Sequence, residues 1–200
     1  MVMERKNDKL KIKSNYTFFP ATKERWKDFE QLFGEKGACA GCWCMYWRTS
    51  QKILDKQKGA GNKNAIKKII FDEKIPGILA YDNSEPVGWC AIAPREEFVR
   101  LENSRILKPL DNKRVWSVTC FFINRKYRNK GMSVDLLNAS KKFVKARGGR
   151  IIEGYPIEPR KNKMPDAFAW VGLSGAFLKS GFKEIARRSE TRPIMRFTIA

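Results

Sequence analysis

The sequence predicts a single-domain α/β protein in which helices flank one mixed central sheet. Segments with apolar residues at helical spacing alternate with β-branched and aromatic runs of strand length, and the chain has no internal repeat. With 200 residues, 42% of them apolar, it can bury a sizeable core as one unit. We expect residues 1–14 to be a flexible amino-terminal segment and residues 15–200 to form the domain.

The amino-terminal third predicts one strand and two helices. Residues 16–19 form a short strand candidate that ends at a proline. Residues 22–33 should form a helix with Thr22 as its N-cap, because large apolar residues recur there at helical spacing. After a polar, glycine-bearing stretch, residues 62–71 read as a second amphipathic helix with three isoleucines on one face.

The middle of the chain predicts three strands. Residues 77–81 and 87–93 are apolar runs separated by the turn sequence DNSEP, which favours a hairpin. A hydrophilic excursion over 94–114 follows, with one helical turn expected at 96–100. Residues 115–123, VWSVTCFFI, form the strongest strand candidate, and their near-continuous apolarity predicts burial on both faces.

The carboxyl-terminal part completes the alternation. A helix over 132–147 should end at a glycine pair and lead into a strand over 150–155. A helix over 166–180 follows, weakened by two internal glycines. Residues 182–188 and 192–199 are closing strands, and an edge formed by the last strand would allow a second copy of the chain to pair as a homodimer.

Composition excludes several kinds of site. The chain has no histidine, so histidine triads, histidine bases and histidine-containing zinc sites are absent. No window approaches the roughly 18 apolar residues of a membrane span, and no signal peptide is evident, so we expect a soluble, cytoplasmic protein. The net charge of +20 favours anionic ligands, such as nucleic acid or a phosphorylated cofactor.

Cysteines gather in the segment GACAGCWCMYWR, residues 37–48. The five cysteines are an odd number with no sign of export, so we interpret them as reduced thiols: Cys39, Cys42, Cys44, Cys90 and Cys120. A closed structural zinc site needs four ligands and the segment holds only three thiols, so we expect no metal. The other interpretations of the segment are a redox centre, the wall of a pocket, or side chains that fill the core between the two amino-terminal helices and the sheet.

The junction after the strongest strand predicts an anion site. The strand runs into a basic loop with Gly131 at its turn, and a helix begins at once. Helix starts present unpaired N–H groups and positive dipole charge, and a glycine lets phosphate oxygens approach them. Four basic side chains add positive charge nearby: Arg125, Lys126, Arg128 and Lys130. The loop matches neither the Rossmann nor the P-loop glycine pattern.

Residues 128–133, RNKGMS, after an apolar strand resemble the Arg/Gln-x-x-Gly-x-Gly/Ala signature of the GCN5-related N-acetyltransferase (GNAT) family. Ser133 departs from the usual Gly or Ala, but it is small and keeps its backbone N–H. Residues 175–182 resemble the family's penultimate helix, which ends in a Gly-Phe pair. The resemblance implies the acyl-CoA N-acyltransferase fold and transfer of an acetyl group from acetyl-CoA to a primary amine of a small molecule or protein.

The resemblance also assigns the cosubstrate contacts. Backbone groups of Phe121, Phe122 and Ile123 would pair with the pantetheine arm as an added strand. The strand that carries them would splay from its parallel neighbour over 150–155, and the thioester would enter the gap. The residues that would hold the pyrophosphate are Arg128, Asn129, Lys130, Gly131, Met132 and Ser133.

For catalysis and acceptor binding the resemblance is incomplete. Many members use a tyrosine as proton donor at the position of Phe177, and phenylalanine cannot donate a proton. We therefore predict that Tyr155 acts as the general acid, with Glu153 as a candidate base on the same strand face. The segment after the first helix would fold over the acceptor side, where three aromatic rings would form an apolar wall: Trp43, Tyr46 and Trp47.

Two other functions stay open from sequence. The charge fits a basic nucleic-acid-binding protein that uses the Cys/Trp segment for stacking, although the basic residues are dispersed and not gathered on one helix or tail. Phenylalanine at position 177 also fits an acyl-CoA-binding protein with weakened catalysis.

Overall fold

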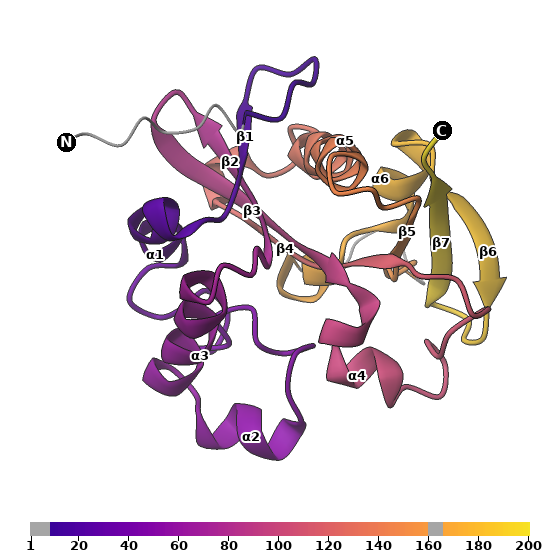
Figure 1. The fold of residues 1–200 in the computed structure, drawn as a ribbon, viewed down its shortest axis with the longest axis horizontal. Helices are drawn as coiled ribbons and strands as arrows, with labels where there is room; N and C mark the ends of the chain where they lie inside the picture. The colour runs from indigo at the N-terminus through magenta and orange to yellow at the C-terminus, as the bar shows by residue number, and fades with distance from the viewer. Residues whose placement is uncertain (1–8, 160–165) are drawn as a thin grey trace.

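The computed structural model describes residues 9–159 and 166–200, which form a seven-stranded mixed sheet with helices packed on both faces (Figure 1). The order across the sheet is β1-β2-β3-β4-β5-β7-β6. The strands are β1 (Thr17–Pro20), β2 (Gly77–Asp82), β3 (Glu85–Pro94), β4 (Trp116–Ile123), β5 (Ile151–Gly154), β6 (Lys183–Arg187) and β7 (Pro193–Thr198). The predicted fold class is therefore confirmed.

All neighbouring strands pair antiparallel except β4 and β5, which are parallel. The hairpin predicted from DNSEP joins β2 to β3. The prediction of a free edge at the last strand is wrong, because β7 lies between β5 and β6 and both of its edges are paired. The edges of the sheet are β1 and β6.

The α-helices in the described part are α1 (Trp26–Phe33), α2 (Gln51–Lys56), α3 (Ala60–Phe71), α4 (Val99–Glu102), α5 (Met132–Lys145) and α6 (Ser174–Lys179). The helix predicted from Thr22 begins with a 3₁₀ turn, Lys23–Arg25, before α1. The Thr22 side chain does not cap it, and instead its Oγ1 accepts a hydrogen bond from Arg25 Nη1 at 3.3 Å.

Two local features differ from the sequence prediction. Helix α2 was not predicted, because it is one and a half turns long and buries only Leu54, which gives no periodic signal. The continuous helix expected over 166–180 is divided into a 3₁₀ helix, Asp166–Val171, and α6. Gly172 separates them with φ of +84°, a backbone conformation that ends a right-handed helix.

The sheet separates two large apolar cores. Helices α5 and α6 cover one face through residues such as Leu136 and Phe177. Helices α1 and α3 cover the other face, where Phe29 and Ile66 pack against Trp89 of β3. Alternate residues of β3 point to opposite faces, so this central strand supplies side chains to both cores.

The segment predicted to be flexible, residues 1–14, lies partly outside the described residues. In its described part, Leu10 donates its backbone N–H to Phe18 O at 2.9 Å, and Leu10 and Ile12 pack against the core beneath α5. Among the described residues, no helix combines the length and the apolar character that crossing a membrane requires.

Candidate functional site

The parallel strands β4 and β5 part before β4 ends. Their pairing covers only Trp116–Val118 of β4 against Ile152–Gly154 of β5. Strand β4 continues to Ile123, so its edge from residue 119 to 123 is not paired with β5, as the family resemblance implied. Burial follows this geometry: residues 117–119 are buried, and β4 becomes partly exposed from Cys120 onward, Phe121 excepted. The prediction of burial along the whole strand is correct for Val115, for residues 117–119 and for Phe121, and wrong for its other residues.

A bulge marks the point where the strands part. The β3–β4 register shifts between Ala91 and Ile92, which leaves Thr119 without a register partner. Thr119 is 2% exposed, and its Oγ1 has no hydrogen-bond partner among the described residues. Bulges next to unpaired strand edges re-aim side chains and are common near active sites.

The β4–α5 junction has the backbone form expected of an anion site. Gly131 is the N-cap of α5 and is left-handed, with φ of +82°, and Asn129 has φ of +60°. Both residues and Lys130 are exposed, so the first turn of α5 is accessible to a ligand. This helix start carries the unpaired N–H groups and the positive dipole that stabilise bound phosphate.

Side chains refine this picture of the junction. Arg128 donates from Nε to the carbonyl oxygen of Ile123 at 3.0 Å, so this predicted pyrophosphate ligand also holds the end of β4. Met132 is 1% exposed and belongs to the core, so only its backbone faces the junction. Asp135, in the first turn of α5, accepts a hydrogen bond from Ser14 Oγ at 2.7 Å.

A cavity of about 320 Å³ lies where the open edge of β4 meets the loop between α1 and α2. It is lined by Cys39, Cys42, Cys44, Tyr46 and Trp47 of the loop, by Cys120, Phe121 and Phe122 of β4, and by Trp170. Three polar side chains of the α2 region stand at its exposed mouth: Gln51, Asp55 and Lys58. The size and apolar lining suit a small organic ligand.

The three aromatic residues predicted as an acceptor wall divide between two places. Tyr46 and Trp47 line the cavity, whereas Trp43 is not among its lining residues. Trp43 is 2% exposed and stacks on Phe33 at 5.7 Å between ring centroids, so it packs behind the cavity in the core. The backbone turns sharply here because Trp43 has φ of +46°, which points its ring inward.

The loop depends on a glycine beneath this ring. A Cβ at Gly37 would lie 2.1 Å from Trp43 Nε1, and Gly37 has φ of +63°. We expect Gly37→Ala to lower the free energy of unfolding by about 1–3 kcal/mol more than Gly34→Ala, because Trp43 must move. Gly34 is a matched control, with φ of +65° and open space around its Cβ position. Urea unfolding of both variants measures the difference, and equal losses would contradict this packing.

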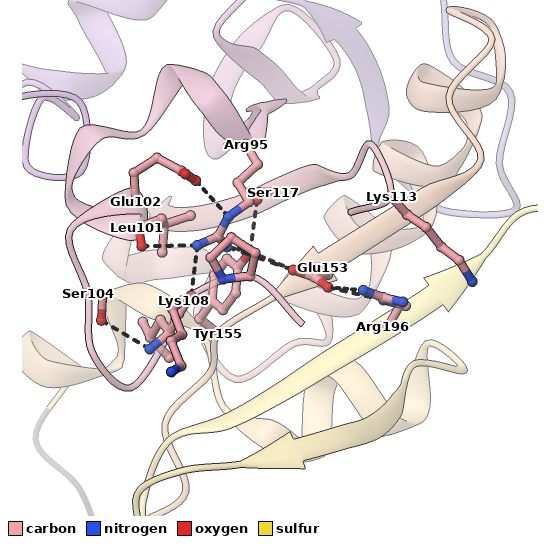
Figure 2. A network of polar contacts seen from close by, with 12 residues as sticks. Arg95, Leu101, Glu102, Ser104, Lys108, Lys113, Ser117, Glu153, Tyr155 and Arg196 are labelled. Atoms are coloured by element: carbon pink, nitrogen blue, oxygen red, sulfur yellow. Dashed lines mark hydrogen bonds and ion pairs between the residues drawn. The ribbon is translucent and has the colours of Figure 1, made fainter. Parts of the chain in front are cut away.

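Tyr155 and Glu153, predicted as acid and base, lie in a buried polar network (Figure 2). Each is 1% exposed, and neither lines the cavity. The Tyr155 hydroxyl donates to Glu153 Oε2 at 2.9 Å, accepts from Arg95 Nη1 at 2.7 Å and contacts Ser117 Oγ at 3.0 Å. Glu153 Oε1 accepts from Arg196 Nη2 at 2.6 Å.

This network does not fit the roles predicted for the two residues. The single hydroxyl proton of Tyr155 is directed at Glu153, and the Glu153 carboxylate is already held by Arg196. Burial, followed by the charge of Glu153, raises the pKa of Tyr155, so the hydroxyl keeps its proton. Arg95 also donates to the carbonyls of Leu101 and Leu107, at 3.0 and 2.8 Å, which ties β5 to the α4 region.

Sequence reasoning missed two residues that shape the site. Trp170 lines the cavity and meets Tyr46 edge-to-face at 4.9 Å. Asn62 is fully buried and donates from Nδ2 to the carbonyls of Gly41 and Leu54, at 3.0 and 3.3 Å, which anchors the loop to α3. A polar residue at the start of an amphipathic helix gives no signal of such long-range bonding.

The comparison with protein families identifies one match. The protein-family model described as "Acetyltransferase (GNAT) family" matches residues 43–155, which run from the Cys/Trp loop to the end of β5. This range includes the part of the cavity loop from Trp43 onward, the bulged strand β4 and the β4–α5 junction. No curated protein sequence matches the chain significantly.

Solved structures of acetyltransferases share this fold at low sequence identity. The PaiA N-acetyltransferase of Thermoplasma acidophilum, solved in complex with coenzyme A, is 15% identical with a TM-score of 0.51, over 92% of this chain and 99% of that one. A GNAT acetyltransferase of Streptococcus agalactiae is 14% identical, TM-score 0.55, covering 92% and 96%. The ribosomal-protein-S5-alanine acetyltransferase of Vibrio fischeri is 11% identical, TM-score 0.51, covering 95% and 96%.

Proposed function

Because the chain belongs to the GNAT acetyltransferase family, we propose that it transfers the acetyl group of acetyl-CoA to a primary amine by direct attack on the thioester. One observation carries the proposal. The edge of β4 beyond Val118, which no strand pairs within the described residues, leads from the cavity, lined by residues 120–122, to the glycine-capped start of α5. An extended cosubstrate with phosphates at one end and a reactive thioester at the other fits such a path.

Each end of this path supplies one kind of interaction. The backbone N–H groups around Gly131 and the nearby lysines would hold the pyrophosphate by hydrogen bonds and charge. The free edge of β4 would pair with the amides of the pantetheine arm, in the manner of an added strand. Similarity to a protein solved with coenzyme A supports this assignment.

The acceptor would occupy the cavity. Its volume of about 320 Å³ admits a small amine, and the rings of Tyr46 and Trp47 offer apolar contact. Asp55 at the mouth is a carboxylate on a strongly basic protein, so it would attract an ammonium group that the net charge otherwise repels. We therefore propose a small, mainly apolar primary amine as the acceptor.

The test is release of free CoA thiol when the protein is mixed with acetyl-CoA and a panel of amines, from alkylamines to arylalkylamines and amino acids. We expect turnover with apolar amines and little with polyanionic ones. In parallel, acetyl-CoA should raise the thermal unfolding temperature. Binding to RNA with a steep salt dependence, together with no response to acetyl-CoA, would replace this proposal by the nucleic-acid-binding function.

Tyr155→Phe separates a structural role from a catalytic one. Because the hydroxyl is bonded to Arg95, Ser117 and Glu153, its loss should lower the free energy of unfolding by about 1–3 kcal/mol. We expect kcat to stay within about threefold of the original protein, since removing a general acid typically costs 100-fold or more. Denaturant unfolding and steady-state kinetics on one preparation test both points. A large fall in kcat would restore Tyr155 as the acid.

A further inference from the structure

Four of the five thiols line one cavity. Cys39, Cys42 and Cys44 reach it from the loop, and Cys120 reaches it from β4, whereas Cys90 lies on the opposite face of the sheet. The thiols of Cys44 and Cys120, here called the thiol pair, line the same cavity, and each shifts the pKa of the other. All five cysteines are free, and no group of three or more potential ligands in the described residues is placed to hold a metal ion.

The surroundings of Cys44 favour a thiolate. Its Sγ accepts a hydrogen bond from Trp89 Nε1 at 3.1 Å. The hydrogen bond from the Cys120 thiol lowers the pKa of Cys44, with further lowering by Trp89 and by the positive charge of Arg48, against the opposing effect of burial. The other titratable groups that line the same cavity are the thiols of Cys39 and Cys42, the phenol of Tyr46, the carboxylate of Asp55 and the ammonium of Lys58.

The pKa values of three other thiols are shifted in the opposite direction. The hydrogen bond with Cys44, followed by burial, raises the pKa of Cys120 well above the ordinary thiol value. Burial raises the pKa of Cys42 to about 11 and that of Cys90 to about 12. Within the thiol pair, therefore, Cys44 loses its proton at a lower pH than Cys120 does.

The thiol pair stands where the reaction needs proton transfer. Cys120 is two residues beyond Val118, the last β4 residue paired with β5, and so lies on the open edge. The position at which the family carries a tyrosine acid is Phe177, which is fully buried against Gly154. The Tyr155 proton is committed to Glu153. The polar residues at the cavity mouth lie on α2 and after it, not on the strand that would carry the thioester.

We propose that Cys44 and Cys120 are the acid–base pair of the acetyl transfer, an inference that rests on the proposed function. The Cys44 thiolate would take one proton from the acceptor ammonium and leave a neutral amine. The amine nitrogen would then attack the thioester carbonyl carbon and form the new C–N bond.

The second half of the step returns the proton. As the C–S bond breaks, its electron pair goes to the CoA sulfur, which takes the Cys120 proton, and Cys120 recovers one from Cys44. The amide nitrogen loses its surplus proton to solvent. One ammonium and one acetyl-CoA thus give one amide, one CoA thiol and one released proton, with no change of oxidation state.

The backbone beneath Cys44 is consistent with a group held in position. Cys44 and Trp43 both have positive φ, +61° and +46°, which is uncommon for residues with side chains. Such conformations persist only where the surrounding structure determines them, and they concentrate at functional sites. Here the stacked Trp43 ring and the Trp89 hydrogen bond fix the loop.

The first experiment needs no knowledge of the acceptor. Timed alkylation of the full-length protein with iodoacetamide at pH 7, followed by peptide mass spectrometry, ranks the thiols by reactivity. We expect Cys44 to react faster than Cys42, although Cys42 is more exposed, and acetyl-CoA to slow its reaction. Reaction of Cys44 no faster than that of Cys42 would overturn the proposal.

The second experiment uses Cys44→Ser and Cys120→Ser, with Cys90→Ala as the control from the opposite face. We expect kcat to fall by about 100-fold or more in the first two and to stay unchanged in the control. Acetyl-CoA should still raise the unfolding temperature of all three, which shows that they fold and bind. If the serine variants bind acetyl-CoA and keep the original kcat, the thiol pair has no role in catalysis. If the unaltered protein itself does not bind acetyl-CoA, the proposed function is wrong.

The pH dependence of kcat/KM distinguishes a catalytic role of Cys44 from a structural one, because a structural role would not shift it. Since the Cys44 pKa is lowered, the rising limb of kcat/KM should lie below the pH at which an ordinary thiol ionises. Trp89→Phe removes one hydrogen bond to the thiolate, so this limb should shift to higher pH. An unshifted limb in Trp89→Phe would contradict the role of Cys44.

Discussion

Gly131→Glu should abolish the stabilisation of this protein by acetyl-CoA. When acetyl-CoA is present at about 100 times its dissociation constant, the free energy of unfolding of the unaltered protein should rise by roughly 2.7 kcal/mol. For a domain of this size that is several degrees in unfolding temperature. Gly131 caps α5 in a left-handed conformation with open space around it. A glutamate there adds bulk and negative charge where the pyrophosphate would bind, and like charges repel.

Gly148→Glu is the matched control for this effect. Gly148 follows the other end of α5, is exposed, and has φ of +71° with open space around its Cβ position. Both variants strain a left-handed glycine, so both should lose some intrinsic stability. Only Gly131→Glu should lose the shift, measured by thermal unfolding with and without saturating acetyl-CoA. A full shift in Gly131→Glu would remove the anion site from the β4–α5 junction.

Glu153→Gln should lower the free energy of unfolding by about 3 kcal/mol, because it removes the buried negative charge between Arg95 and Arg196, which then keep only the more exposed carboxylates of Glu102 and Asp111. Glu153 Oε1 lies 2.6 Å from Arg196 Nη2, and its Oε2 lies 3.8 Å from Arg95 Nη1. Arg95 is 6% exposed, so water cannot replace the lost carboxylate charge there.

The control is Glu184→Gln, which breaks an ion pair of the same length at the surface. Glu184 Oε2 lies 2.6 Å from Arg187 Nη2, but the Glu184 side chain is 38% exposed against 2% for Glu153. Pairs exposed to solvent typically contribute about 0–1 kcal/mol. Denaturant unfolding of both variants should therefore separate them clearly. Equal losses would mean that Glu153 reorganises into contact with water.

Most of the fold followed from local pattern. Strands and helices such as β4 and α5 were predicted within a few residues, because their hydrophobic periodicity and their glycine and proline boundaries are encoded in neighbouring positions. The exceptions are instructive. Helix α2 is too short to show a period, and the break at Gly172 depends on a left-handed turn that sequence alone only weakly marks.

The place of the last strand shows a different limit. Its residues were recognised as a strand, yet its position between β5 and β6 depends on which edges are free when the sheet assembles. Likewise Tyr155 and Glu153 were correctly placed on one face of their strand. Their hydrogen-bond donors, however, are Arg95, which follows β3, and Arg196 of β7. The alternation of side chains along a strand predicts which face of the sheet each side chain points to, but not which residues of other elements it contacts there.

By itself the sequence determined the α/β class, the glycine-capped start of α5 at Gly131 and the absence of histidine chemistry, because each depends on composition or on residues adjacent in the chain. Only the tertiary structure decided that Trp43 turns into the core, that Arg95 buries the hydroxyl of Tyr155, and that Cys44 meets Cys120 at one cavity. These contacts join distant residues. They form because packing α1, α3 and the loop against one face of the sheet leaves each side chain a single environment, and that environment sets its protonation and its chemistry.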